Sequence, residues 1–269
     1  MDVTSRLTAL TLAEGVSELV RRDSHLAAVV ERFGSPPLWD RAPGFETLVQ
    51  IILEQQVSLS AGRAAFGRLE RAAGAVTPEA IARTDDAALR NAGLTRQKSS
   101  YIRGLAQAIV AGEFDPTAVA EMDDDAARAA LVKLRGIGGW SANIYLLMAL
   151  GRADIWPDGD LALVAALREV KRMRAIPDVE RIRQVTNSWR PWRAVAARVL
   201  WHHYLSTPRT RAKISAAKPS ARRTVAPSRR PARIDPRSAT RSRTPSRASA
   251  ADGSSRRGAR TPRGGRTRD

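Results

Sequence analysis

The chain has 269 residues, with 45 Lys or Arg against 27 Asp or Glu, and its formal net charge is +18. It contains no cysteine, which excludes disulfides and cysteine-ligated metal clusters. No apolar window of about eighteen residues occurs and no secretory signal opens the chain, so neither a membrane span nor export is expected.

The spacing of apolar residues is helical almost throughout residues 1–206, and no alternating β-branched run with hairpin turns occurs. Helices are expected near residues 3–30, along the stripe Phe45, Leu48, Val49, Ile52 and Leu53, and through Ala64, Ala65 and Leu69. Thr77-Pro78 and Thr84-Asp85-Asp86 are typical helix starts, and Gly93 ends a helix that Thr95 can restart. Further helices are expected at residues 124–133, 140–150, 161–172, 179–188 and 193–204. The predicted fold class is all-α.

The run Leu-Arg-Gly-Ile-Gly-Gly-Trp-Ser-Ala-Asn, residues 134–143, predicts a tight turn between two helices. Gly136 and Gly138 permit the positive φ angles and the close backbone approach of such a turn. The N–H groups of the turn and of the helix after it can point at a phosphate, aided by the helix dipole. Many helix-to-helix turns also contain two glycines, so the run alone indicates either a phosphate-binding turn or a plain one.

The next motif, Trp156-Pro157-Asp158-Gly159-Asp160-Leu161, places Asp160 at the start of an expected helix. An aspartate there can be a plain N-cap, or a functional carboxylate that the helix dipole keeps ionised. Asp158 is the nearby competitor. The spacing from Pro157 and the leucine that follows favours Asp160.

These motifs resemble the helix-hairpin-helix, Gly-Pro-Asp (HhH-GPD) superfamily of DNA glycosylases, in which Leu-x-Gly-Ile-Gly-x-(Trp or Lys)-(Ser or Thr)-Ala is followed after about seventeen residues by Pro-x-x-Asp. Residues 45–59 and 93–98 resemble earlier motifs of that superfamily, and residues 189–201 are similar to the closing helix of its alkylpurine branch, the 3-methyladenine glycosylase II group.

The resemblance implies two packed helical lobes with a DNA-binding cleft between them. The lack of cysteine sets aside the branch that carries an iron-sulfur cluster. Only about 44 residues precede Phe45, so the resemblance is to the compact type without an α/β domain ahead of the helical core.

The resemblance also implies a reaction. Asp160 would stabilise the positive charge that develops on the sugar as a base leaves, and would orient or deprotonate the attacking water. Trp140 stands where bifunctional members have a lysine that attacks the sugar. The implied activity is therefore that of a monofunctional glycosylase without lyase activity, which leaves an abasic site.

A nucleotide that is flipped out of the duplex needs a pocket with aromatic walls. The resemblance assigns Trp140, Trp201 and Ile144 to this pocket, in which a cationic alkylated purine such as 3-methyladenine or 7-methylguanine would gain cation-π attraction. Both tryptophans could instead be core residues. Ile144 stands where the best-known bacterial relative has an aromatic residue, which leaves the range of lesions open.

The superfamily binds the DNA backbone through the hairpin, which here comprises Gly136, Ile137, Gly138, Gly139 and Ser141. Gln55 and Gln56 stand where members insert a wedge side chain into the gap left by the flipped nucleotide, and otherwise they form an ordinary polar helix end. The chemistry requires no metal. In relatives the hairpin carbonyls hold a monovalent cation, Na⁺ or K⁺, and the resemblance implies that such an ion could bridge the hairpin to a phosphate here.

Residues 207–269 carry 19 Lys or Arg against 3 Asp, net +16, whereas residues 1–206 carry 26 against 24, net +2. We expect the tail to be disordered, because it has no aromatic residue and few large aliphatic ones. It either binds polyanions with strong salt dependence or serves solubility alone.

The leading hypothesis is thus a monomeric, cytoplasmic and nucleoid-associated enzyme of base excision repair that excises alkylated purines from double-stranded DNA. The alternatives are a noncatalytic DNA-binding protein of the same fold and a glycosylase for other damaged bases.

Overall fold

The computed structural model describes residues 6–207, and this part of the chain is helical apart from one isolated β-bridge between Arg6 and Arg152. Its helices are α1 (Ala9–Arg22), α2 (Ser24–Phe33), α3 (Phe45–Glu54), α4 (Leu59–Ala73), α5 (Pro78–Arg83), α6 (Asp86–Asn91), α7 (Arg96–Val110), α8 (Pro116–Ala120), α9 (Asp124–Val132), α10 (Gly139–Met148), α11 (Leu161–Val170), α12 (Val179–Asn187) and α13 (Arg193–Ser206). The all-α prediction is confirmed. The prediction of a disordered tail falls, apart from Thr207, outside the described residues.

Short polar side chains mark where many of these helices begin. Thr77 caps α5 with Pro78 in the first turn, and Thr95 caps α7, both as the sequence predicts. One start is shifted, because Asp85 caps α6 through Ala88 N while Thr84 ends α5. The caps therefore separate short helices that apolar periodicity alone would run together.

Some helix boundaries differ from the sequence prediction by one or two residues, and one helix was missed. Helix α10 begins at Gly139, one residue before Trp140, and α11 ends at Val170 because the chain turns at Arg172, whose φ is +53°. Helix α8 was not predicted. Its signal is Asp115, which caps the helix, followed by Pro116 in the first turn.

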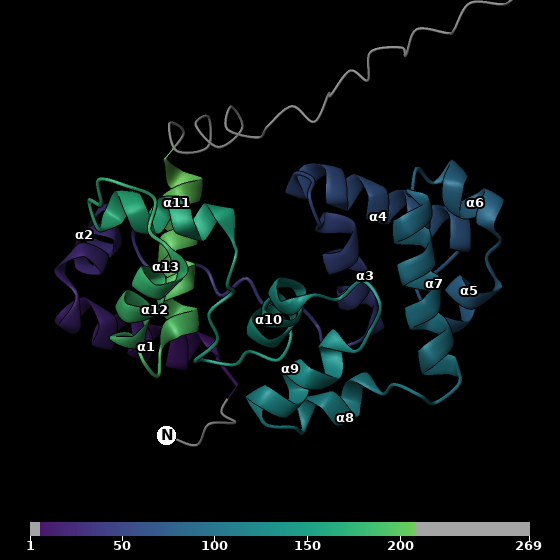
Figure 1. Ribbon diagram of the computed structural model, residues 1–269, viewed down its shortest axis with the longest axis horizontal. Helices are drawn as coiled ribbons and strands as arrows, with labels where there is room; N and C mark the ends of the chain where they lie inside the picture. Colours follow the sequence, from purple (N-terminus) through teal and green to yellow (C-terminus); the bar gives the residue numbers. More distant parts are fainter. Residues whose placement is uncertain (1–5, 208–269) are drawn as a thin grey trace, which may run out of the picture. The chain divides into compact units, whose positions relative to one another are not determined.

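The helices pack into two lobes (Figure 1). In the first lobe α3 packs on α4, α7 and α10, while α5 and α6 lie on α7 and α9 joins α10 to α8. In the second lobe α13 is the central helix and packs on α1, α2 and α11. The first lobe is one continuous piece of sequence, whereas the second combines helices from both ends of the described chain. None of the described helices is long and apolar enough to cross a membrane.

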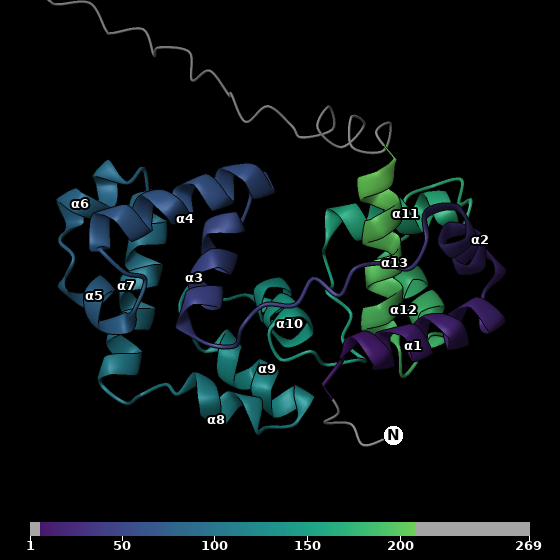
Figure 2. The same cartoon turned by 180° about the vertical axis from the view of Figure 1, so that it is seen from behind.

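The two lobes are joined by the segments 34–44 and 149–160, which both views show crossing between them (Figures 1 and 2). Arg198 of α13 fixes this junction. This residue is 1% exposed, and its guanidinium donates to the carbonyls of Leu38 (2.7 Å), Leu147 (2.9 Å) and Ala194 (3.1 Å). Burial lowers the pKa of Arg198 to about 10, against a raising effect of Asp40, so the side chain stays charged at neutral pH.

Candidate active site

The carboxylate of Asp160 is held by three N–H donors. As the N-cap of α11 it accepts from Leu163 N at 2.9 Å on Oδ1. The indole Nε1 of Trp140 donates to Oδ2 at 3.1 Å, and the indole Nε1 of Trp201 donates to Oδ1 at 3.4 Å. The structure thus brings together the predicted catalytic residue and two of the predicted pocket residues, from α10 and α13, where the two lobes meet.

The loop before α11, which contains Trp156 and Asp160, is held in place by a residue of α10. Asn143 of α10, 2% exposed, donates its side-chain amide to the carbonyl of Trp156 at 3.0 Å. Gly159 has a φ of +80°, which favours glycine and turns the chain so that Asp160 can cap the helix. Asn143 belongs to the hairpin motif, but sequence reasoning gave it no role, because its partner is a backbone atom that no motif shows.

Asp158 is separated from this arrangement. It is exposed, and its backbone N–H bonds to the carbonyl of Trp156, two residues earlier in the loop. Asp160 is instead half-buried against the two indoles. The geometry favours Asp160 over Asp158 as the reactive carboxylate, as the motif spacing does.

The three predicted pocket residues differ in exposure. Trp140 is half-buried, whereas Trp201 is 8% exposed and Ile144 is 4% exposed. Ile144 follows Trp140 by one helical turn on α10 and packs into the core. The two indole rings therefore lie beside the carboxylate with their N–H groups engaged, and the contact of any of the three with a base stays a prediction.

The hairpin, residues 134–142, presents free backbone N–H groups. The first bond within α10 runs from Ala142 N to Gly138 O, so the N–H groups of Gly139, Trp140 and Ser141 have no acceptor in their own helix. Gly138 is the N-cap and carries no side chain that could bind them. Gly138 and Gly139 are exposed, and these N–H groups together with the dipole suit an anion.

The turn itself rests on α7. Gly136 has a φ of +92°, and a Cβ at this position would lie 2.3 Å from the ring of Tyr101. The guanidinium of Arg135 lies over the same ring, 5.9 Å from its centroid. Ile137 is buried and ties the turn to the core. Gly136 is therefore required for both its φ and its close approach to Tyr101, a contact that the sequence does not reveal.

The wedge loop, residues 55–58, separates the two predicted wedge residues. Gln55 is half-buried, and its amide donates to Gly136 O at 2.8 Å and to Ser141 Oγ at 2.9 Å. Gln56 is exposed and has a φ of +59°. The structure thus links Gln55 to the hairpin and leaves Gln56 facing solvent, where a wedge can meet DNA.

Lys98 of α7 also holds the wedge loop in place. Its ammonium donates to Leu53 O at 2.7 Å and to Gln55 O at 3.0 Å, at the C-terminal end of α3. Burial lowers the pKa of Lys98 from its ordinary value. Lys98 lies in the Gly93–Lys98 motif of the resemblance, but sequence reasoning assigned it no function.

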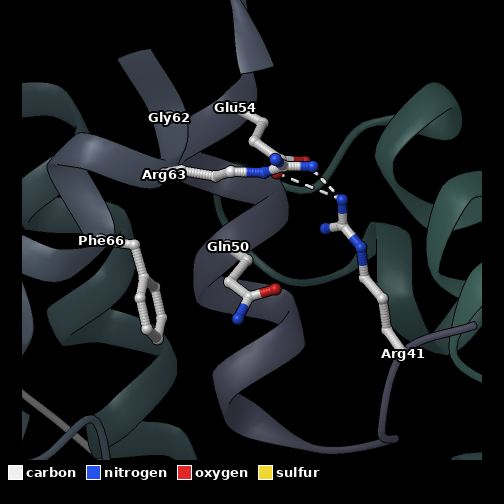
Figure 3. Close-up of a pocket in the computed structure, with 6 residues that line it drawn as sticks. All are labelled: Arg41, Gln50, Glu54, Gly62, Arg63 and Phe66. Carbon is white, nitrogen blue, oxygen red and sulfur yellow. Dashed lines mark hydrogen bonds and ion pairs between the residues drawn. The ribbon is translucent and has the colours of Figure 1, made fainter. Parts of the chain in front are cut away.

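A hollow of about 270 Å³ lies between α3 and α4, next to the wedge loop (Figure 3). Arg41, Gln50, Glu54, Gly62, Arg63 and Phe66 line it. The guanidinium Nη2 of Arg41 donates to both carboxylate oxygens of Glu54, at 3.1 and 2.9 Å. This ion pair fixes the last residue of α3 to the segment that leads into it.

Among residues 6–207 no group of three or more His, Asp or Glu side chains is placed to hold a metal ion. The prediction of a monovalent cation concerns backbone carbonyls instead. One of these, Gly136 O, already accepts the Gln55 amide.

Comparison with known proteins adds to this geometry. Residues 49–191 match the family described as "HhH-GPD superfamily base excision DNA repair protein". The DNA-3-methyladenine glycosylase of Bacillus subtilis is 31% identical over 123 residues, which are 46% of this chain and 41% of that protein. DNA-3-methyladenine glycosylase 1 of Schizosaccharomyces pombe is 26% identical over 200 residues, which are 72% of this chain and 88% of that protein.

Solved structures show the same fold. The DNA-3-methyladenine glycosidase of Bacillus halodurans aligns with a TM-score of 0.61 and 29% identity, over 71% of this chain and 88% of that one. The 3-methyladenine DNA glycosylase of Schizosaccharomyces pombe, solved in complex with abasic DNA, aligns with a TM-score of 0.65 and 24% identity, over 70% of this chain and 95% of that one.

Proposed function

Because the chain belongs to the HhH-GPD superfamily of base excision DNA repair proteins, we propose that it is a monofunctional DNA glycosylase. It removes alkylated purines of the 3-methyladenine type from duplex DNA and leaves an abasic site. The observation that carries the proposal is the Asp160 carboxylate held between the N–H groups of Trp140 and Trp201. The names of the relatives from Bacillus and Schizosaccharomyces support the choice of substrate.

DNA binding begins at the hairpin. The free N–H groups of Gly139, Trp140 and Ser141, at the positive end of α10, bind a phosphate of the damaged strand without reading its sequence. Only the backbone N–H of Ser141 takes part, because its side chain is buried and engaged with Gln55. A monovalent cation on the hairpin carbonyls would add a positive charge at the same phosphate.

The nucleotide is then flipped toward the indoles, and Gln56 fills the gap that it leaves. A purine that carries a positive charge gains from the electron-rich faces of Trp140 and Trp201. Its glycosidic bond is already weakened by that charge, so no separate acid is needed to protonate the leaving base.

Asp160 stabilises the sugar as it becomes positively charged. A carboxylate offers about four acceptor positions. Two on Oδ1 are taken by Leu163 N and Trp201, and one on Oδ2 is taken by Trp140. The remaining position on Oδ2 accepts the attacking water and orients it toward the sugar. No lysine amine stands at position 140, so water is the nucleophile.

The test is release of free methylated base from methylated duplex DNA by wild type, Asp160→Asn and the control Asp158→Asn. Asparagine still caps a helix, so the fold is kept while the charge is lost. We expect the rate of release to fall about 100- to 1000-fold in Asp160→Asn, with DNA binding retained, and to stay at the wild-type level in the control.

Strand breaks should form only after alkali treatment of the product. Breaks before alkali would show a lyase. No release of any base by wild type, together with equal binding of damaged and intact duplexes, would instead indicate the noncatalytic DNA-binding protein. Release of deaminated or oxidised bases alone would assign a different lesion to the same site.

A further inference from the structure

The two glutamines of the wedge loop have opposite surroundings. The side chain of Gln55 is half-buried and makes two hydrogen bonds to the hairpin, while that of Gln56 is exposed. The orientation of the Gln55 amide is fixed by chemistry. Its NH₂ group must face Gly136 O, because its own carbonyl oxygen would be repelled there. Gln55 therefore acts as a donor that joins the wedge loop to the turn which binds phosphate.

The loop is held on two further sides. Lys98 donates to the carbonyls of Leu53 and Gln55, which are otherwise free at the end of α3. The Arg41–Glu54 ion pair holds the residue immediately before the loop (Figure 3). The chain is thus held at residues 53 and 54, the end of α3, and at residue 55, directly before the exposed Gln56.

Gln56 itself has a backbone conformation that L-residues seldom adopt. Its φ of +59° lies in the left-handed region, which a non-glycine residue occupies only where neighbouring contacts enforce it. The contacts of Leu53, Glu54 and Gln55 supply that enforcement. The result is a side chain that projects to solvent before any DNA is bound.

We propose that Gln55 is a positioning residue, which couples the wedge loop to the hairpin so that Gln56 alone enters the duplex. This inference rests on the proposed function. Gly136 and Ser141 accept from Gln55, and the N–H groups of Gly139, Trp140 and Ser141 bind the phosphate, so both activities share one turn. Phosphate capture and wedge insertion then occur as one step, since the turn cannot move without carrying the loop.

The first test compares Gln55→Met with Gln107→Met, a matched change at an exposed position of α7. Methionine keeps the length and neutrality of glutamine but cannot donate. We expect single-turnover release of methylated base to fall about tenfold in Gln55→Met, the order that two lost neutral hydrogen bonds produce, with DNA affinity near wild type and a melting temperature lower by a few degrees, because both bonds are already present in the free protein. Gln107→Met should match wild type in all three measurements.

The second test is a double-mutant cycle with Ser141→Ala, which removes one of the two acceptors of Gln55. We expect Ser141→Ala to slow release on its own and to cause no further loss when Gln55 is already Met. If the two effects multiply, Gln55 and Ser141 act independently, Gln55 does not act through the hairpin and the inference is wrong.

A third readout does not need chemistry. With 2-aminopurine placed beside an abasic analogue in the duplex, wedge insertion raises the fluorescence. Gln56→Ala should abolish this rise in fluorescence. Gln55→Met should reduce it, although the DNA affinity of this variant stays near that of wild type. If wild type raises fluorescence but releases no base, the proposed function fails and the positioning role stands. If Gln55→Met abolishes the rise while Gln56→Ala keeps it, Gln55 is the wedge and the inference fails.

Discussion

The carboxylate of Asp160 accepts two indole hydrogen bonds of unequal length. Trp140 Nε1 lies 3.1 Å from Oδ2, and Trp201 Nε1 lies 3.4 Å from Oδ1. A hydrogen bond weakens with length, and one to a charged group is worth more than one between neutral groups. The Trp140 bond should therefore contribute more to the position of the Asp160 carboxylate.

This difference predicts an order of effects for two phenylalanine variants, each of which keeps an aromatic face and loses the N–H. We expect Trp140→Phe to lower the single-turnover rate of base release about three- to tenfold, and Trp201→Phe to lower it less. Rates on methylated duplex DNA, with melting temperatures as the control for folding, test the order. The reverse order would mean that the longer bond of the free protein is the one that matters in the complex.

Gly136 of the hairpin leads to a prediction for a second pair of variants. Gly136→Ala brings a Cβ against the ring of Tyr101 at a φ of +92°, and should lower the free energy of unfolding by about 1–3 kcal/mol. In Gly104→Ala the Cβ meets nothing within 4 Å in the helix α7, so a gain of about 0.5–1 kcal/mol is expected. Urea unfolding of both variants measures the difference. Equal stability of the two would contradict the contact with Tyr101.

At the scale of helices, the sequence predicted type and order well because the signals are local. Capping residues such as Thr77 and Thr95 and the apolar stripe of α3 depend only on neighbours in the chain. The short helix α8 was missed because its five residues are too few to show periodicity, although Asp115 and Pro116 mark its start.

Only part of the candidate site could be predicted from the sequence, because some of its contacts are local and others are not. Asp160 could be named from the motif spacing, but the partners of Gln55, Lys98 and Arg198 lie far along the chain and are mostly backbone carbonyls. Every residue carries a carbonyl, so no pattern of residue types identifies such a partner. These contacts follow only from tertiary packing.

The packing of α13 on α11 and α2 makes the free energy of unfolding depend on pH through His203. Burial lowers the pKa of His203, assisted by Arg32 and opposed by Glu169, whose carboxylate Oε1 lies 3.8 Å from Nε2. The unfolded chain, with a pKa of about 6.5, therefore binds more protons than the folded protein below that pH. The stabilisation is present in full above about pH 6.5 and is lost as the pH falls through the folded value.

We therefore expect the melting temperature to fall as the pH is lowered from about 7 to about 5, and to fall less in His203→Gln. Thermal denaturation of both proteins across this range is the measurement. If the melting temperature of His203→Gln falls as far as that of wild type, a group other than His203 is responsible for the pH dependence.

At the scale of the whole molecule, the charge is divided between two parts of the chain. Residues 207–269 carry a net charge of +16 and residues 1–206 only +2. A chain truncated after Ser206 should bind DNA more weakly and with a smaller dependence on salt, because fewer counterions are released. Base release at saturating protein should be unchanged. Binding titrations at several salt concentrations check this, and a folded but inactive truncation would contradict it.

The second lobe combines helices from both ends of the described chain, so it can fold completely only late in translation. Helices α1 and α2 leave the ribosome first, yet their partner α13 begins roughly 160 residues after α2 ends. At about 5–20 residues per second the wait is roughly 10–30 s, during which α1 lacks Trp192 and Val195, which lie against its Gly15 in the folded protein. Trp201 arrives with α13, the last helix among the described residues. The nascent chain thus holds the hairpin turn and Asp160 before the carboxylate gains its second indole, and both indole contacts are present only once α13 has docked.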